Sequence, residues 1–263
     1  MVIKIPKKRI GNNYLFSIEL ILLVLIGIGI TTITDTKTGT NKNACLSLTF
    51  DDGLESHYSI VYPLLKEKNF TATFFIIANI SSDPDDLGRR FMSSEDIKKL
   101  SEDNFEIGSH TLSHEKLTNL SKEEIEKELK ESKELLEKTY NISIYSVAFP
   151  YGDYDKNVLK IARKYYLNTR SISEYEKEHL IINSFAMKQN INVQDICQYI
   201  DYANRNKLLL IIIFHDISNK PKLWDTSIED FKTILKCIDD SKIKVGSITE
   251  CNEIKKSLYV SAD

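Results

Sequence analysis

The sequence predicts one α/β domain, a deformed (β/α) barrel of about seven parallel strands, preceded by a hydrophobic N-terminal helix. Short apolar, β-rich runs alternate with amphipathic helical stretches from Ala44 onward, which is typical of βα units and a parallel sheet. The run Leu208–Phe214 is apolar on both faces, as a strand between a barrel interior and a helix should be. Once an N-terminal leader is set aside, the chain of 263 residues has room for one large domain with a single core.

The N-terminus carries basic residues ahead of an apolar segment. Cations cluster in Lys4–Arg9, and the segment Tyr14–Ile33 that follows is largely apolar and long enough to cross a bilayer. We expect residues 1–33 to form an uncleaved single-pass anchor with its basic end in the cytoplasm and the catalytic domain outside the cell membrane. A cleaved signal followed by secretion is the alternative, and a buried core helix is a third interpretation. Residues 34–43 are polar and predict a linker to a domain at 44–256.

Seven strands and one clear helix are expected in the domain. Ser121 and Glu124 form a capping box at the start of the helix Ser121–Lys138, which carries an apolar stripe. The expected strands are Cys45–Phe50, Thr71–Ile77, Phe105–Ser109, Tyr145–Phe149, Tyr166–Arg170, Leu208–Phe214 and Lys244–Ile248.

Composition excludes several classes of function. A net charge of -3 gives no basic footprint for nucleic acid, and 42% hydrophobic with 28% charged residues indicates a folded domain rather than a disordered or multi-span chain. The four cysteines form no C-x-x-C pair, so a thiolate zinc site is not expected. Cys197 and Cys237 could form a disulfide in an exported domain, with buried free thiols as the alternative.

Polar residues follow several predicted strands at the point where each ends. Asp51 and Asp52 follow the first strand, His110 and His114 the third, and His215 the long apolar one. The carboxyl ends of parallel barrel strands meet on one face, so these side chains should converge. A spacing of four places both imidazoles of the histidine pair on one side if that segment is helical.

Each group alone has an ordinary explanation, because Asp-Asp-Gly is a turn signal, a histidine pair can be a surface feature, and a lone histidine can sit in a core. Together, one carboxylate and two histidines make a facial triad with open positions for water and substrate. A second carboxylate could then act as a base and a further histidine as an acid, which completes an amide hydrolase. His57 and His179 are expected to be surface residues.

The motifs Thr49–Gly53, His110–His114 and Phe214–His215 stand in the order and at the spacing of a known family. Over about Ala44–Glu250 the chain resembles the NodB-homology domain of polysaccharide deacetylases, carbohydrate esterase family 4. The resemblance implies hydrolysis of N-acetyl groups on an amino-sugar polysaccharide of the N-acetylglucosamine type. It also implies a divalent metal, with Zn²⁺ expected and Co²⁺, Ni²⁺ or Mn²⁺ as alternatives.

The resemblance also implies the roles of individual residues. Asp51 would be the general base and His215 the general acid, and the backbone N–H of Tyr151 would stabilise the oxyanion. Pro150, Tyr151 and Trp224 would contact substrate, although a lone tryptophan more commonly caps the core. The implied metal ligands are Asp52, His110 and His114.

One departure concerns the third motif. The family usually opens that motif with an arginine that pairs with the base carboxylate, and Ala148 stands there in Ala148–Gly152. The Phe-Pro-Tyr-Gly version resembles the branch that acts on poly-N-acetylglucosamine. Asp51 is left without an obvious partner, for which Lys188 is a candidate. The family's fourth motif, whose acidic residue orients the acid histidine, is not evident. Asp216 is adjacent to His215 but could point away from it.

Three other functions stay open at this stage. A deformylase or small-amide hydrolase on the same fold would use the same metal and base with a tighter pocket. A catalytically inactive glycan-binding module is suggested by Ala148 and by the missing fourth motif. A membrane-tethered scaffold with no ligand would carry no divalent metal. For the favoured deacetylase we expect a monomer whose partners are an N-acetylated glycan and, through residues 1–33, the membrane.

Overall fold

The computed structural model of the chain describes residues 44–80, 83–171 and 184–260. The predicted anchor and linker, and His179, lie outside these residues. None of the helices in the described ranges is long and apolar enough to span a membrane.

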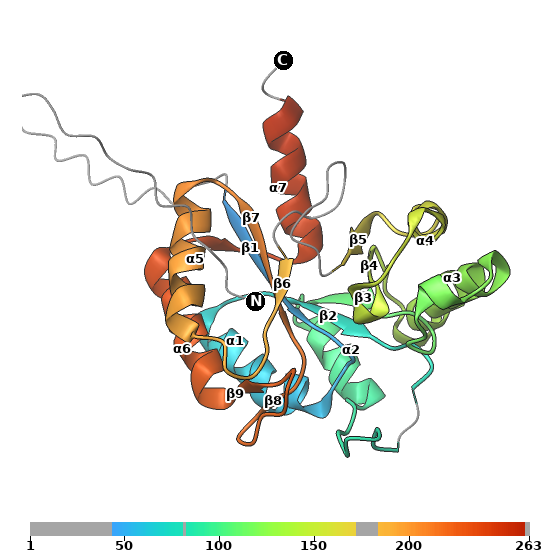
Figure 1. The fold of residues 1–263 in the computed structure, drawn as a ribbon, viewed down its shortest axis with the longest axis horizontal. Helices are drawn as coiled ribbons and strands as arrows, with labels where there is room; N and C mark the ends of the chain where they lie inside the picture. The colour runs from blue at the N-terminus through green and yellow to red at the C-terminus, as the bar shows by residue number, and fades with distance from the viewer. Residues whose placement is uncertain (1–43, 81–82, 172–183, 261–263) are drawn as a thin grey trace, which may run out of the picture. The chain divides into compact units, whose positions relative to one another are not determined.

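A curled sheet of parallel strands forms the centre of the domain (Figure 1). Its strand order is β5-β4-β3-β2-β1-β7-β6, and β10 pairs with the beginning of β1. This half-barrel confirms the predicted deformed (β/α) barrel. The strands are β1 (Cys45–Phe50), β2 (Thr73–Ile76), β3 (Glu106–Ser109), β4 (Ser146–Ala148), β5 (Asn168–Arg170), β6 (Ser184–Ala186), β7 (Leu209–Phe214) and β10 (Lys244–Val245); β8 (Ile217–Ser218) and β9 (Thr226–Ser227) form a separate pair.

Two expectations about the strands were wrong. The edge strand β6 was not predicted, because three residues carry too little pattern to identify a strand. The last strand was predicted to run to Ile248, yet β10 has only two residues and Ile248 already begins a helix.

Helices cover the sheet on its outer side, with α5 and α6 next to one another and α3 and α4 at the other end of the sheet (Figure 1). The capping box predicted for α3 is present, since Ser121 Oγ accepts from Glu124 N at 3.3 Å and Glu124 Oε2 accepts from Ser121 N at 2.8 Å. The helices are α1 (Tyr62–Lys68), α2 (Ser94–Glu102), α3 (Lys122–Tyr140), α4 (Lys156–Ala162), α5 (Val193–Arg205), α6 (Ile228–Ser241) and α7 (Ile248–Val260), with a π-helical turn at His57–Val61 and 3₁₀ turns at Leu117–Asn119 and Pro150–Gly152.

Strand β7 divides the apolar core into two layers. Its residues Leu210, Ile212 and Phe214 join the large cluster between sheet and helices. The alternate residues Leu209, Ile211 and Ile213 join a second cluster with residues of other strands and of α7. Both faces of β7 are therefore buried, as its uninterrupted apolar sequence predicts.

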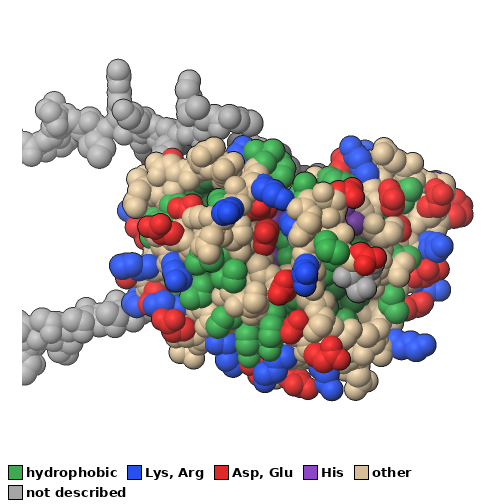
Figure 2. Space-filling model, turned by 90° about the horizontal axis from the view of Figure 1, so that it is seen from below, with side chains coloured by type: hydrophobic (Ala, Val, Ile, Leu, Met, Phe, Trp, Pro, Cys, Tyr) green, Lys and Arg blue, Asp and Glu red, His purple; other side chains and the backbone are tan. Residues whose placement is uncertain are grey.

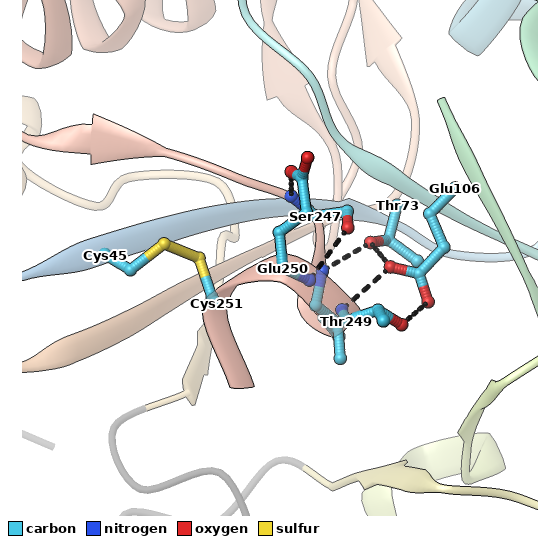
Figure 3. The surroundings of a disulfide bond; sticks show 8 residues. Cys45, Thr73, Glu106, Ser247, Thr249, Glu250 and Cys251 are labelled. Atoms are coloured by element: carbon cyan, nitrogen blue, oxygen red, sulfur yellow. Dashed lines mark hydrogen bonds between the residues drawn. A yellow bond between two sulfur atoms is a disulfide. The ribbon is translucent and has the colours of Figure 1, made fainter. Parts of the chain in front are cut away.

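Helix α7 begins beside the N-terminal ends of the strands, where a disulfide and hydrogen bonds hold it (Figures 1 and 3). A disulfide joins Cys45 at the start of β1 to Cys251 of α7. Glu106, the first residue of β3, accepts hydrogen bonds from Thr73 Oγ1 at 3.1 Å and from Thr249 N and Oγ1 at 3.0 and 2.8 Å. A carboxylate at a helix N-terminus is favoured by the free N–H groups and the dipole there.

A second disulfide, Cys197–Cys237, joins α5 to α6. It settles the pairing that the sequence left open. The Cys45–Cys251 bridge spans 206 positions of the chain and had no signal in the sequence.

Candidate active site

Asp51 and Asp52 lie in a turn directly after β1. Asp51 N still donates to Phe214 O of β7 at 2.9 Å, and the backbone then turns through positive φ at Asp52 (76°) and Gly53 (74°). A Cβ on Gly53 would lie 3.2 Å from Ile76 Cδ1, so this turn favours glycine both for its φ and for its close neighbour. Both aspartates are buried.

His110 and His114 lie on a loop, not on a helix as the four-residue spacing suggested. His110 N donates to Ile76 O at 2.8 Å, and the chain then takes positive φ at Thr111 and His114. Glu128 of α3 stabilises this loop, because its Oε2 accepts hydrogen bonds from the backbone N–H groups of Leu112 and Ser113, each at 3.0 Å. Glu128 was not predicted from the sequence, because its position is that of an ordinary surface residue of an amphipathic helix.

The structure brings Asp52, His110 and His114 together. Asp52 Oδ1 lies 3.5 Å from His110 Nε2 and 3.4 Å from His114 Nε2, and the ligand atoms of the three residues are within 4.8 Å of one another. His110 Nδ1 lies 2.9 Å from Ala148 O, which orients Nε2 towards the cluster.

This donor set fits a divalent metal ion. Asp52 Oδ1 is buried and has no hydrogen-bond partner among the described residues. A buried carboxylate oxygen facing two imidazole nitrogens is costly without a bound cation or proton. One carboxylate and two histidines with further positions open is a set used by catalytic metal sites.

Burial and charge set the protonation states of these groups. Burial acts to raise the pKa of Asp51, but the Arg170 guanidinium and the His110 imidazole hold that pKa below its usual value. Burial, followed by the charge of His110, lowers the pKa of His114 to about 4. Asp51 is therefore ionised and His114 neutral at neutral pH, and the neutral imidazole is the form that binds metals. Burial acts to lower the pKa of His110, but Asp51 and Asp52 hold that pKa above its usual value, so a metal ion would replace a proton at this residue.

The cation beside Asp51 is Arg170, and Lys188 is not its partner. Arg170, the last residue of β5, forms an ion pair with Asp51 Oδ1, and its side chain is 1% exposed. It pairs in register with Ala148 of β4, so the cation missing from the third motif is supplied by the neighbouring strand. Lys188 is exposed and lines a separate cavity of about 230 Å³ between residues 187–191 and 221–230. The signal for Arg170 was an arginine ending a predicted strand.

His215 follows β7 on the same side of the sheet as the cluster, and it contributes to lowering the pKa of both Asp51 and Asp52. Its buried Nδ1 has no hydrogen-bond partner within the described ranges. Asp216 does not orient it, because Asp216 Oδ1 accepts from Ser56 Oγ at 2.6 Å. The Trp224 ring is 49% exposed and lies 6.3 Å from that of His215, so this tryptophan does not cap the core.

His57 was expected on the surface, and this was wrong. Its side chain is fully buried, and its Nε2 lies 2.9 Å from the backbone oxygen of His215. Its ring packs against Phe50 and Phe74, and burial lowers its pKa to about 4. The turn before α1 points inward at this position, which a polar local sequence did not reveal.

The 3₁₀ turn at Pro150–Gly152 places Tyr151 beside the cluster. Tyr151 has φ 60°, and its 65% exposed ring lies 4.9 Å from the ring of His114. The first backbone N–H groups of such a turn have no partner within it. Pro150 is buried, so it supports the turn rather than facing solvent. From the side shown in Figure 2, histidine side chains are visible among acidic and basic ones.

Two curated relatives match about half of the chain. Chitin deacetylase 1 of Cryptococcus neoformans is 33% identical over 116 residues, which is 44% of this chain and 23% of that protein. The poly-beta-1,6-N-acetyl-D-glucosamine N-deacetylase of Staphylococcus aureus is 29% identical over 126 residues, 44% of this chain and 43% of that protein. The chain thus spans less than half the length of either relative.

A solved structure shares the fold. The Xyl-CE4 domain of a multidomain xylanase from the hindgut metagenome of Trinervitermes trinervoides superposes with a TM-score of 0.56 at 18% identity, covering 81% of this chain and 92% of that one. A family model described as polysaccharide deacetylase matches residues 38–169, half of the chain. The chain belongs to the polysaccharide deacetylase family.

Proposed function

We propose that this protein hydrolyses the N-acetyl groups of an amino-sugar polysaccharide of the N-acetylglucosamine type. The observation that carries the proposal is the cluster of the buried Asp52 and His110 with the half-buried His114, and an ionised Asp51 beside it. The family supports the reaction class. The names of the two relatives, together with the Phe-Pro-Tyr-Gly sequence at 149–152, favour a polymer of N-acetylglucosamine.

Asp52, His110 and His114 would hold the metal, and zinc suits this set of nitrogen and oxygen donors best, with cobalt, nickel and manganese as alternatives. When bound, a divalent cation makes water more acidic and polarises an amide carbonyl.

The other residues would move protons and hold the substrate. Asp51, kept ionised by Arg170, accepts a proton from the attacking water. His215 lies on the same side and returns a proton to the leaving nitrogen. The Tyr151 backbone N–H faces the developing oxyanion. The exposed rings of Tyr151 and Trp224 provide flat surfaces for sugar rings.

We propose further that the domain works outside the cell membrane. Its two disulfides are typical of oxidising compartments. The basic and apolar pattern of residues 4–33 suits an anchor or export signal.

Acetate release from chito-oligosaccharides and from poly-N-acetylglucosamine tests the function, using the full chain with added Zn²⁺ or Co²⁺. We expect metal-dependent release that Asp51→Asn reduces by about 10²–10⁴-fold. Asp239→Asn, which changes an exposed aspartate of α6, serves as the matched control and should leave the rate unchanged.

Two results would favour the alternatives. Cleavage of small formamides with no release from glycans would indicate a small-amide hydrolase. Equal and negligible rates for wild type and Asp51→Asn, with glycan binding retained, would indicate an inactive binding module.

A further inference from the structure

Arg89 lies beside Asp52 on the side away from the histidines. Its Nη2 is 3.5 Å from Asp52 Oδ2, whereas both imidazole nitrogens approach Oδ1. The two oxygens of this carboxylate therefore have different neighbours. Neither the motifs nor the sequence pattern singled out Arg89.

A tight turn holds the Arg89 side chain in place. Asp85 Oδ2 accepts from Arg89 Nε at 2.6 Å, and Asp85 Oδ1 accepts from the backbone N–H of Leu87 and Arg89 at 2.9 and 2.8 Å. Asp85 N in turn donates to Arg89 O at 3.0 Å. One carboxylate thus fixes both the backbone and the guanidinium of the same residue.

The same turn is tied to the segment that carries Asp52. Glu55 N donates to Arg90 O and Met92 N donates to Gly53 O, each at 2.9 Å. Lys222 Nζ also donates to Leu87 O within this turn, at 2.7 Å. The position of Arg89 relative to Asp52 is consequently set by backbone contacts and not by the ion pair alone.

Arg89 would have two opposite effects on a bound cation. The positive charge of Arg89 would repel a cation, and its contact with Oδ2 would hold the carboxylate in the orientation that directs Oδ1 at the histidines. Asp85 lies closer to Arg89 than Asp52 does, 2.6 against 3.5 Å, and largely cancels that charge at longer range. The orienting effect should therefore dominate.

We propose that Arg89 is a positioning residue for the metal-binding carboxylate of Asp52. It holds Oδ2 on the outer side of the site and leaves Oδ1 directed at His110 and His114. Partners of this kind around a metal ligand contribute to affinity by fixing ligand orientation. The inference rests on the metal site of the proposed function and is independent of which glycan is the substrate.

The test is the zinc dissociation constant of the purified full chain, measured by competition with a chromophoric chelator. We expect Arg89→Ala to weaken zinc binding by about 10–100-fold. Asp85→Asn should also weaken it, because the guanidinium loses its anchor. Arg89→Lys should give an intermediate value, since lysine cannot contact both carboxylates in the same fork geometry. The matched control is Arg90→Ala, which removes the adjacent arginine side chain and keeps the backbone bond to Glu55.

Arg89→Ala separates the two effects, because Asp85→Asn is expected to weaken binding under either of them. If Arg89→Ala binds zinc as tightly as wild type or more tightly, the orienting effect does not dominate and the inference is overturned. The proposed function would survive that result if wild type still binds zinc and releases acetate. Failure of wild type to bind zinc would overturn both. Circular dichroism of each variant shows whether weaker binding reflects loss of the fold.

Discussion

The two ends of the sheet carry polar groups of opposite character. At the N-terminal end, the half-buried Glu106 of β3 has both carboxylate oxygens hydrogen-bonded, to β2 and α7 (Figure 3) and also to Ser146 of β4. At the C-terminal end, Asp52 Oδ1 and His215 Nδ1 are buried without a hydrogen-bond partner among the described residues. A carboxylate with all its hydrogen bonds made stabilises the fold, and a buried carboxylate oxygen without one is available for a ligand.

The backbone shows the same contrast. Positive φ at the C-terminal end falls on residues of the candidate site, Asp52, His114 and Tyr151. At the other end, Asn104 and Lys207 have positive φ just after α2 and α5, where a left-handed residue ordinarily terminates a helix. Unusual backbone geometry without a capping role therefore identifies the functional end of the barrel.

The largest expected effect comes from His110, at the functional end of β3. His110→Ala removes one of three metal ligands, so bound metal and acetate release should both fall below detection. The thermal unfolding midpoint of the metal-free chain should change little. Metal analysis, an acetate assay and thermal melts check this, and retained activity would contradict the assignment of the site.

Substitution of Arg170 should have the second largest effect on activity. Arg170→Met leaves the buried Asp51 without its cation, so burial raises the pKa of Asp51 and the acid limb of kcat/KM moves to higher pH. We expect kcat/KM at neutral pH to fall by about 10²-fold. Lys188→Ala is the control and should keep the wild-type pH profile; a shifted profile in that variant would restore Lys188 as the partner. The double variant Ala148→Arg, Arg170→Ala should recover part of the rate.

At the structural end, the Cys45–Cys251 disulfide should matter more for stability than Cys197–Cys237, because the bridges close 206 and 40 positions. Replacing the first pair by serine should lower the free energy of unfolding by about 5 kcal/mol, and replacing the second by about 4 kcal/mol. Denaturant titration measures both, and zinc affinity should be unchanged. The reverse order of the two losses would contradict a chain-entropy origin.

Glu106→Ala tests the contribution to stability of the N-terminal end of β3, the strand that His110 follows. It leaves donors on Thr73, Ser146 and Thr249 without their acceptor, so we expect a loss of about 3 kcal/mol in unfolding free energy. The rate of acetate release well below the unfolding temperature should be retained. A lower rate of acetate release with an unchanged free energy of unfolding would show that the N-terminal end of the sheet also contributes to activity.

His57 should give the smallest effect, confined to acidic pH. Its pKa is 6.5 when free and about 4 in the fold, so the unfolded chain binds the proton more tightly. Stability should therefore fall as pH drops from 6.5 towards 4, by at most about 3 kcal/mol, and then level off. His57→Gln should show a flatter pH dependence in the same range. An identical slope in both proteins would show that other groups cause the acid loss.

The sequence alone determined the strands β1 to β5 and β7, and it placed a helix at 121–138 that the structure has at 122–140, because apolar periodicity and a capping box are local signals. It also located Asp51, Asp52, His110 and His215, because residues that follow parallel strands must meet on one face. Tertiary structure decided the rest. Register placed Arg170 opposite Ala148, a turn buried His57, and chain closure brought Cys45 to Cys251. These outcomes depend on which distant strands are neighbours and on where each side chain points, and neither is encoded in any short stretch of sequence.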